Sequence, residues 1–126
     1  MSASDNLSRP QWEQLPMFMF AGELKEKANY SDDGLSQNAK LNSRVWDKKL
    51  KESKKGKNSL YKSIESEGVK EPIEVRHHLN KSLFIPANSY EIYNGHHRLA
   101  AAAAINPNML VPVDYKVTKF KKVDRD

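Results

Sequence analysis

The sequence of 126 residues contains no cysteine. This absence excludes a disulfide framework, a thiol nucleophile and a metal site built on thiolates. It also matches the reducing cytoplasm, where we expect the protein to reside. The longest apolar run, Leu99 to Ile105, is far too short to span a bilayer, so no membrane partner is expected. No basic start followed by an apolar segment marks the N-terminus as a signal peptide.

Apolar residues are also scarce, at 38%, whereas charged residues make up 29% of the chain. A chain of this length has room for one domain. We expect a single domain over residues 15–118, preceded by a disordered polar tail at 1–14 and followed by a basic tail at 119–126.

The most informative stretch that is present predicts a strand, a tight turn at Asn94-Gly95 and a helix rich in alanine. Glycine lets the chain turn with positive φ and brings the backbone close to a ligand. His96, His97 and Arg98 follow on the first helical turn, where free N–H groups and the positive end of the helix dipole lie. These residues therefore form a candidate site for phosphate or another anion.

Each basic residue of this turn has its own chemistry. The Arg98 guanidinium matches two phosphate oxygens. His97 can donate to phosphate or act as an acid or base near neutral pH, and so can His96. Consecutive helical residues point about 100° apart, so one histidine should be more exposed than the other. The alternative is that Arg98 pairs with a nearby carboxylate and one histidine packs in the core.

The chain contains two pairs of adjacent histidines, which could in principle bind a metal ion. His77-His78 and His96-His97 are adjacent in sequence, and neighbouring side chains diverge on a strand or a helix, so no transition-metal site is predicted. Magnesium on a bound nucleotide needs only one or two carboxylates. The candidates are Glu65, Glu67, Glu71 and Glu91. No P-loop, Rossmann glycine fingerprint or Ser-His-Asp signature is present.

The net charge is +5, and the positive excess lies between residues 44 and 62 and in the tail from residue 116 onward. Basic clusters attract nucleic acid, and the candidate contacts are Lys48, Lys51, Lys54, Lys55 and Lys57. The alternative is a solvated, lysine-rich helix face.

Periodicity and turn signals predict a modest set of elements. We expect Ser43 to cap a helix over 44–55 that packs Trp46, and Ser59 and Gly68 to bound a helix over 60–67. Residues 30–43 are expected to form a loop, and residues 77–87 an irregular segment or weak hairpin. The other expected helices are 21–29 and 96–104, and the expected strands are 72–75, 90–93 and 110–117.

Three segments in order carry a family resemblance: LYKSIESEGVKEPIEV at 60–75, YEIYNGHHRLAAA at 90–102 and LVPVDY at 110–115. Together they resemble the ParB/sulfiredoxin superfamily, in its branch of small standalone ParB-like nuclease-domain proteins of actinobacteria and their phages. The resemblance implies an α+β fold with a small mixed sheet and packed helices.

Relatives hold a nucleotide phosphate on the corresponding turn: ATP in sulfiredoxins, CTP in partition ParB proteins and ADP in a free-serine kinase branch. The resemblance therefore implies CTP or ATP with Mg²⁺ as cofactor. It implies that Gly95, His96, His97 and Arg98 hold the phosphates and that the Glu71-Pro72-Ile73 corner approaches the rest of the nucleotide. With Asn94 of the turn, residues 94–98 form the predicted binding set, and the catalytic candidates are His97 and Glu71.

Differences between this sequence and its relatives argue against three of the activities that those relatives have. Without cysteine the chain cannot reduce a sulfinic acid as sulfiredoxins do. Partition ParB proteins carry Gly-Glu-Arg-Arg at the turn and a helix-turn-helix domain after it. This chain has Gly-His-His-Arg at the turn and nine residues after Val117, so DNA partition is not expected. Asn94 stands where the kinase branch prefers aspartate, which argues against phosphoryl transfer.

Three functions stay open. The first is a nucleotide-binding ParB-like domain, with nucleoside triphosphatase or nuclease activity as the reactions such a site allows. The second is a non-enzymatic DNA-binding accessory protein that uses the lysine-rich helix. The third is a phage protein that binds and inhibits a host protein, because a fold alone does not determine function.

Overall fold

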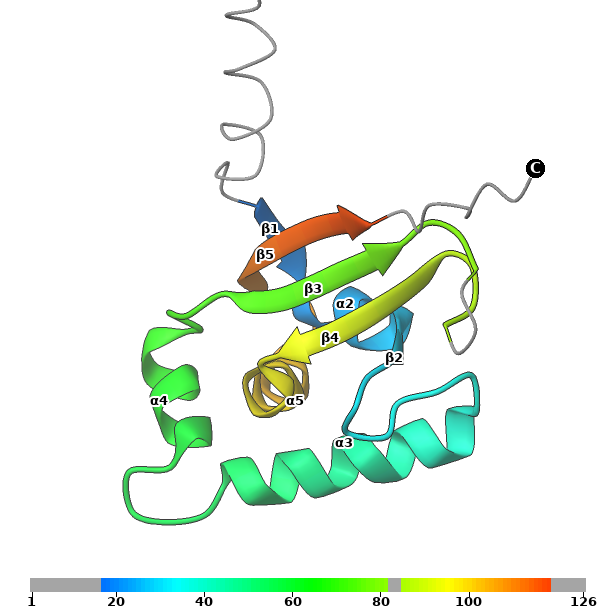
Figure 1. Ribbon diagram of the computed structural model, residues 1–126. Coiled ribbons are helices and arrows are strands. Elements are labelled where there is room, and N and C mark those ends of the chain that lie inside the picture. The colour runs from blue at the N-terminus through cyan, green and yellow to red at the C-terminus, as the bar shows by residue number, and fades with distance from the viewer. Residues whose placement is uncertain (1–16, 82–84, 119–126) are drawn as a thin grey trace, which may run out of the picture.

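The computed structural model describes residues 17–81 and 85–118. The tails expected at 1–14 and 119–126 lie outside the described residues. Within these residues the chain forms a five-stranded mixed sheet and four helices (Figure 1). The expected α+β fold with a small mixed sheet and packed helices is confirmed.

The sheet has the strand order β1-β5-β3-β4-β2. Its outer pair β1/β5 is antiparallel, β5/β3 is parallel, β3/β4 is antiparallel and β4/β2 is parallel. The strands are β1 (Met17–Phe20), β2 (Ala28–Tyr30), β3 (Ile73–His78), β4 (Ser89–Asn94) and β5 (Leu110–Thr118). The helices are α2 (Ala21–Lys27), α3 (Ala39–Ser53), α4 (Leu60–Glu67) and α5 (His96–Ile105).

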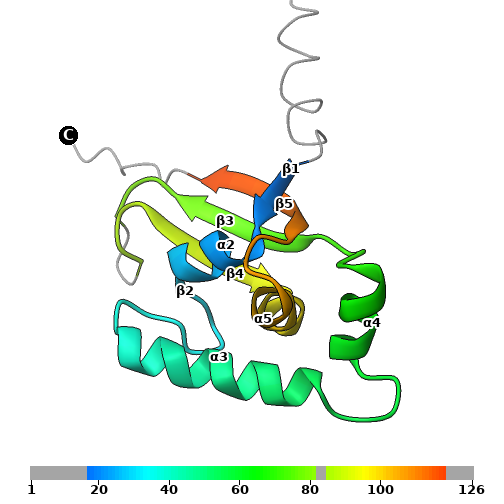
Figure 2. The ribbon, with the colours of Figure 1, turned by 180° about the vertical axis from the view of Figure 1, so that it is seen from behind.

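Helix α5 is the centre of the helical layer. Figure 2 shows α2 and α5 on the same face of the sheet, and α5 also contacts α3 and α4. Leu99 and the alanines 100–103 of α5 are buried in the core. Because alanine is small, the helix backbone packs close to its neighbours. The start of α5 is therefore held from several sides.

Helix α3 begins earlier than the sequence predicts. Asn38 is its N-cap, and the Asn38 Oδ1 accepts from the backbone N–H groups of Lys40 and Leu41 at 3.0 and 3.2 Å. The loop predicted at 30–43 is therefore wrong in its last part, and Ser43 lies inside the helix. The predicted packing role of Trp46 is confirmed, since this side chain is buried.

The helix predicted at 60–67 is confirmed with both of its caps. Ser59 Oγ accepts from the Lys62 N–H at 3.2 Å, and Gly68 ends the helix at φ +77°. Strand β3, in contrast, runs on through His77 and His78, where an irregular segment was predicted. Contacts across strands explain the difference, because the His77 ring stacks on Tyr90 with 4.1 Å between centroids. Residues 82–84 of that predicted segment lie outside the described residues.

In the described part of the chain, no helix has both the length and the apolar character needed to cross a membrane.

Candidate functional site

The turn that joins β4 to α5 adopts the conformation that its glycine allows. Gly95 has φ +105° and is the N-cap of α5, and no side chain among the described residues caps this helix. The Gly95 carbonyl accepts from the Leu99 N–H at 2.9 Å, which leaves the N–H groups of residues 96–98 without partners inside the helix. A donor-rich helix start is therefore presented at the end of β4.

A pocket of about 360 Å³ lies at this helix start. All five residues that the sequence predicts as a binding set line it, so the structure brings them together. The full lining is Asp33, Leu60, Tyr93, Asn94, Gly95, His96, His97 and Arg98. A second pocket of about 260 Å³ shares Leu60 and Arg98 with the first and extends to Glu71.

Arg98 lies between the two pockets and is held from one side. Its Nη1 pairs with Glu71 Oε2 at 3.2 Å, and its Nη2 donates to the Pro72 carbonyl at 3.1 Å. The Glu71 side chain is 79% exposed, whereas that of Arg98 is 18% exposed. Arg98 Nε is buried and has no hydrogen-bond partner among the described residues. The ion pair with a carboxylate, offered above as an alternative, is thus present beside the pocket.

His97 is the more exposed of the two histidines. Its Nε2 lies 2.8 Å from Glu52 Oε1, and the side chains are 42% and 34% exposed. The hydrogen bond from His97 is the main cause that lowers the pKa of the Glu52 carboxyl, and burial partly opposes it. A carboxylate that orients an imidazole at the rim of a pocket is a common arrangement for proton transfer.

His96 is the buried histidine. Its Nδ1 lies 3.1 Å from Asp33 Oδ2, and its ring lies against Trp46 with 5.9 Å between centroids. Its Nε2 is buried and has no partner within the described residues. Burial lowers the pKa of His96, which leaves the imidazole neutral near pH 7. His96 therefore offers the pocket a backbone N–H and a neutral ring.

We expect the buried His96 to make the protein less stable in mild acid. Burial lowers its pKa from 6.5, the charges of Lys49 and His97 lower it further, and Asp33 opposes them. The unfolded chain thus takes up a proton near pH 6.5 that the folded chain does not, so the free energy of unfolding falls as pH drops through that range. Thermal melts from about pH 8 to about pH 5 should show this slope, and His96→Gln should flatten it. Equal slopes in both proteins would contradict the assignment.

Each basic residue of the turn pairs with a carboxylate from a different element. Asp33 comes from the loop after β2, Glu52 from α3 and Glu71 from the connection between α4 and β3. The sequence identified Glu71 but missed Asp33 and Glu52, because nothing local marks a carboxylate that reaches the turn through packing. In the ranges 17–81 and 85–118, no three His, Asp or Glu side chains gather in a group that could hold a metal ion.

The other three magnesium candidates lie on α4 or in the sheet. Glu67 pairs with Lys70 at 2.7 Å on the surface, and Glu65 is exposed on α4. Glu91 is buried in β4 and pairs with His78 at 2.7 Å. Of the four candidates, Glu71 is the one that contacts a basic residue of the turn.

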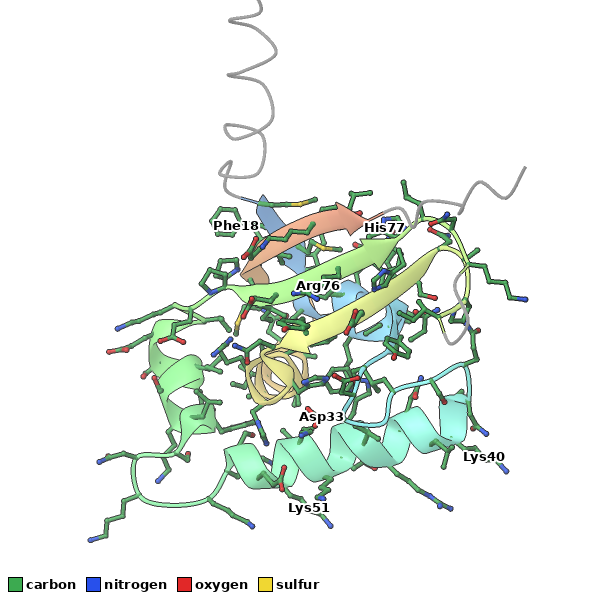
Figure 3. The ribbon with its side chains drawn as sticks, viewed as in Figure 1. Phe18, Asp33, Lys40, Lys51, Arg76 and His77 are labelled. Atoms are coloured by element: carbon green, nitrogen blue, oxygen red, sulfur yellow. The ribbon has the colours of Figure 1, made fainter. Side chains whose placement is uncertain are left out.

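The predicted nucleic-acid contacts lie on and after α3. Lys48 and Lys51 are exposed on the helix, Lys54 places its Nζ 4.8 Å from the Tyr61 ring centroid, and Lys55 and Lys57 are exposed in the following turn. Figure 3 shows Lys51 on the side of α3 that points away from the sheet. Four exposed basic residues at helical spacing form what we call the α3 stripe: Lys40, Arg44, Lys48 and Lys51.

One comparison with known proteins identifies the family of this chain. The family model of the ParB N-terminal domain matches residues 40–122, which include α3 except its first residue, α4, and α5 with the turn before it. No curated protein and no solved structure matches the chain. The family match spans well over half of the sequence and contains the three segments noted above. The chain therefore belongs to the family of the ParB N-terminal domain.

Proposed function

We propose that this domain binds the phosphate chain of a nucleoside triphosphate, CTP or ATP, at the start of α5. The observation that carries the proposal is the lining of one pocket by residues 94–98 at a helix start that no side chain of residues 17–81 and 85–118 caps. Free N–H groups and the positive end of a helix dipole favour an anion at that position.

The residues of the turn would share the work of holding the phosphates. The backbone N–H groups of residues 96–98 donate to phosphate oxygens, since Gly95 lets the ligand approach the main chain. Arg98 adds a charged fork once its Nη1 exchanges the Glu71 carboxylate for phosphate. The Glu71 carboxylate is well exposed and can turn away at little cost.

The residues also suit magnesium on the bound nucleotide. Mg²⁺ on a nucleotide takes one or two carboxylates and fills its other positions with phosphate oxygens and water. Glu71, once released from Arg98, and Glu52 beside His97 would supply such carboxylates. When bound, the cation neutralises charge between these carboxylates and the phosphates.

A hydrolytic reaction at this site would use His97. Its Nε2 is oriented by Glu52, and its side chain reaches the pocket that the phosphates would occupy. The imidazole can then accept a proton from a water that attacks the terminal phosphorus, while the bond from that phosphorus to the bridging oxygen breaks and the nucleoside diphosphate leaves. Glu71, once released from Arg98, is the second carboxylate beside the turn. We therefore assign proton transfer to His97 for triphosphatase or nuclease chemistry.

Isothermal titration calorimetry tests the binding proposal. CTP, ATP and ADP are titrated with Mg²⁺ into the purified protein, whose folding is checked by circular dichroism. We expect saturable binding of at least one triphosphate and weaker binding of ADP. A folded protein that gives no heat with any of the three rules out the proposal. Phosphate release measured on the same samples tests the role of His97 through His97→Ala.

A second candidate function, binding of nucleic acid, is favoured by the α3 stripe. Contacts to about four phosphates would give a slope of about −3.6 in log K against log salt concentration. Lys48→Ala/Lys51→Ala should reduce that slope by about 1.8. Fluorescence anisotropy with a labelled duplex at several KCl concentrations measures the slope. The matched control is Lys27→Ala/Lys116→Ala, which removes two exposed lysines from other elements. Equal slopes for the two double variants would count against the stripe.

A further inference from the structure

We infer that Tyr93 forms a stacking surface for the base of the bound nucleotide and that Arg76 holds it in place. The inference rests on the proposed function and names which part of the ligand the second half of the pocket takes. Tyr93 and Arg76 do not belong to the binding set predicted from the sequence.

Tyr93 is placed beside the turn but is not part of it. It is the next-to-last residue of β4, two positions before Gly95, and it lines the same pocket as residues 94–98. Its side chain is 50% exposed, so the ring is open to a ligand in the pocket. Two residues of extended chain span roughly 7 Å, about the reach of a ribose between its base and its first phosphate.

Arg76 fixes one face of the Tyr93 ring. The guanidinium carbon lies 3.5 Å from the ring centroid, and Arg76 stands on β3, next to β4 in the sheet. Figure 3 shows Arg76 over these strands. Arg76 is not among the residues that line the pocket. A cation on one face of a ring leaves the other face for an aromatic partner.

The rest of the lining points to a ligand with an apolar part. Leu60 from α4 adds an aliphatic surface to the aromatic one of Tyr93, while the anion-binding groups lie at Gly95 and beyond. Asn94, between the two halves, donates its amide N–H to Glu74 Oε2 at 2.9 Å. An inorganic polyphosphate would leave Tyr93 and Leu60 without contacts, whereas a nucleotide would cover both. The lining therefore selects a base-bearing phosphate.

The test compares ATP with inorganic triphosphate in calorimetry with Mg²⁺. We expect the native protein to bind ATP more tightly than triphosphate. Tyr93→Ala should lower the affinity for ATP about tenfold, which is the scale of one lost base stack, and change the affinity for triphosphate by less than about twofold. Tyr93→Phe keeps the ring and should retain ATP affinity. Arg76→Gln should lower it by less than Tyr93→Ala does.

Three outcomes would overturn the inference. Equal losses of ATP and triphosphate in Tyr93→Ala would show that Tyr93 supports the turn and does not contact the base. Equal affinities of the native protein for ATP and triphosphate would show that no base is recognised. Absence of binding by CTP, ATP and triphosphate alike would reject the proposed function, and with it this inference. Thermal melts of each variant confirm that losses of affinity do not come from unfolding.

Discussion

Arg98→Ala should weaken the binding of a nucleoside triphosphate by roughly 1.5–3 kcal/mol, the scale of a hydrogen bond to a charged group. This corresponds to a roughly 10- to 150-fold rise in Kd. Arg98 is the residue of the turn whose charge does not depend on pH, and it lies between the two pockets at the helix start. Its loss removes both the charge and the fork that matches two phosphate oxygens.

The measurement is a calorimetric titration of native and variant proteins under identical salt and Mg²⁺. Arg44→Ala is the matched control, because it removes an arginine that is exposed on α3 and does not line the pocket. We expect this control to bind the nucleotide like the native protein. If Arg98→Ala binds with native affinity and keeps its fold, the phosphate site lies elsewhere in the molecule.

Gly95→Ala should destabilise the protein by about 2 kcal/mol or more. The backbone at Gly95 has φ +105°, and for other residues the left-handed region costs about 1–2 kcal/mol. A Cβ would also lie 3.2 Å from Ile73 Cγ1 and 3.1 Å from Arg98 Nη2. The first contact presses on the core, and the second displaces the guanidinium. We therefore expect a loss of nucleotide affinity together with the loss of stability.

Gly56 provides a control that separates the cost of the backbone conformation from the cost of the Cβ contacts. It has φ +89°, and a Cβ there would meet no atom within 4 Å. Urea unfolding of Gly56→Ala should therefore show the backbone cost alone, with nucleotide affinity unchanged. Equal destabilisation by the two substitutions would mean that the contacts with Ile73 and Arg98 cost nothing, and native nucleotide affinity in Gly95→Ala would separate the turn from the site.

Local signals predicted much of the fold. Ser59 and Gly68 bound α4 as expected, because capping depends on residues within one helical turn. The start of α3 was missed because both Asn38 and Ser43 are good capping residues, and packing around the helix decides between them. The end of β3 was missed for a related reason. His77 and His78 carry no strand signal of their own, and their partners Tyr90 and Glu91 lie on β4.

In the candidate site, too, local features could be predicted from the sequence and features set by packing could not. Residues 94–98 are contiguous, so their turn and helix start could be predicted from the sequence, and the structure places them around one pocket. Asp33 and Glu52 reach the turn from the loop after β2 and from α3, a placement that only the packing of these elements against α5 sets. Tyr93 was missed because an aromatic residue in a strand usually indicates core packing, whereas here strand alternation turns it outward.

The alanines of α5 have a consequence for how the site can respond to a ligand. An alanine side chain has no rotamers, so burying residues 100–103 restricts no side-chain torsion. The helix that carries the turn therefore packs without ordering any of these side chains. The side chains that can change conformation beside the turn are long ones, such as those of Glu52 and Glu71. A ligand bound at the turn, as we propose, would therefore meet the backbone of a closely packed helix and long acidic side chains from separate parts of the chain.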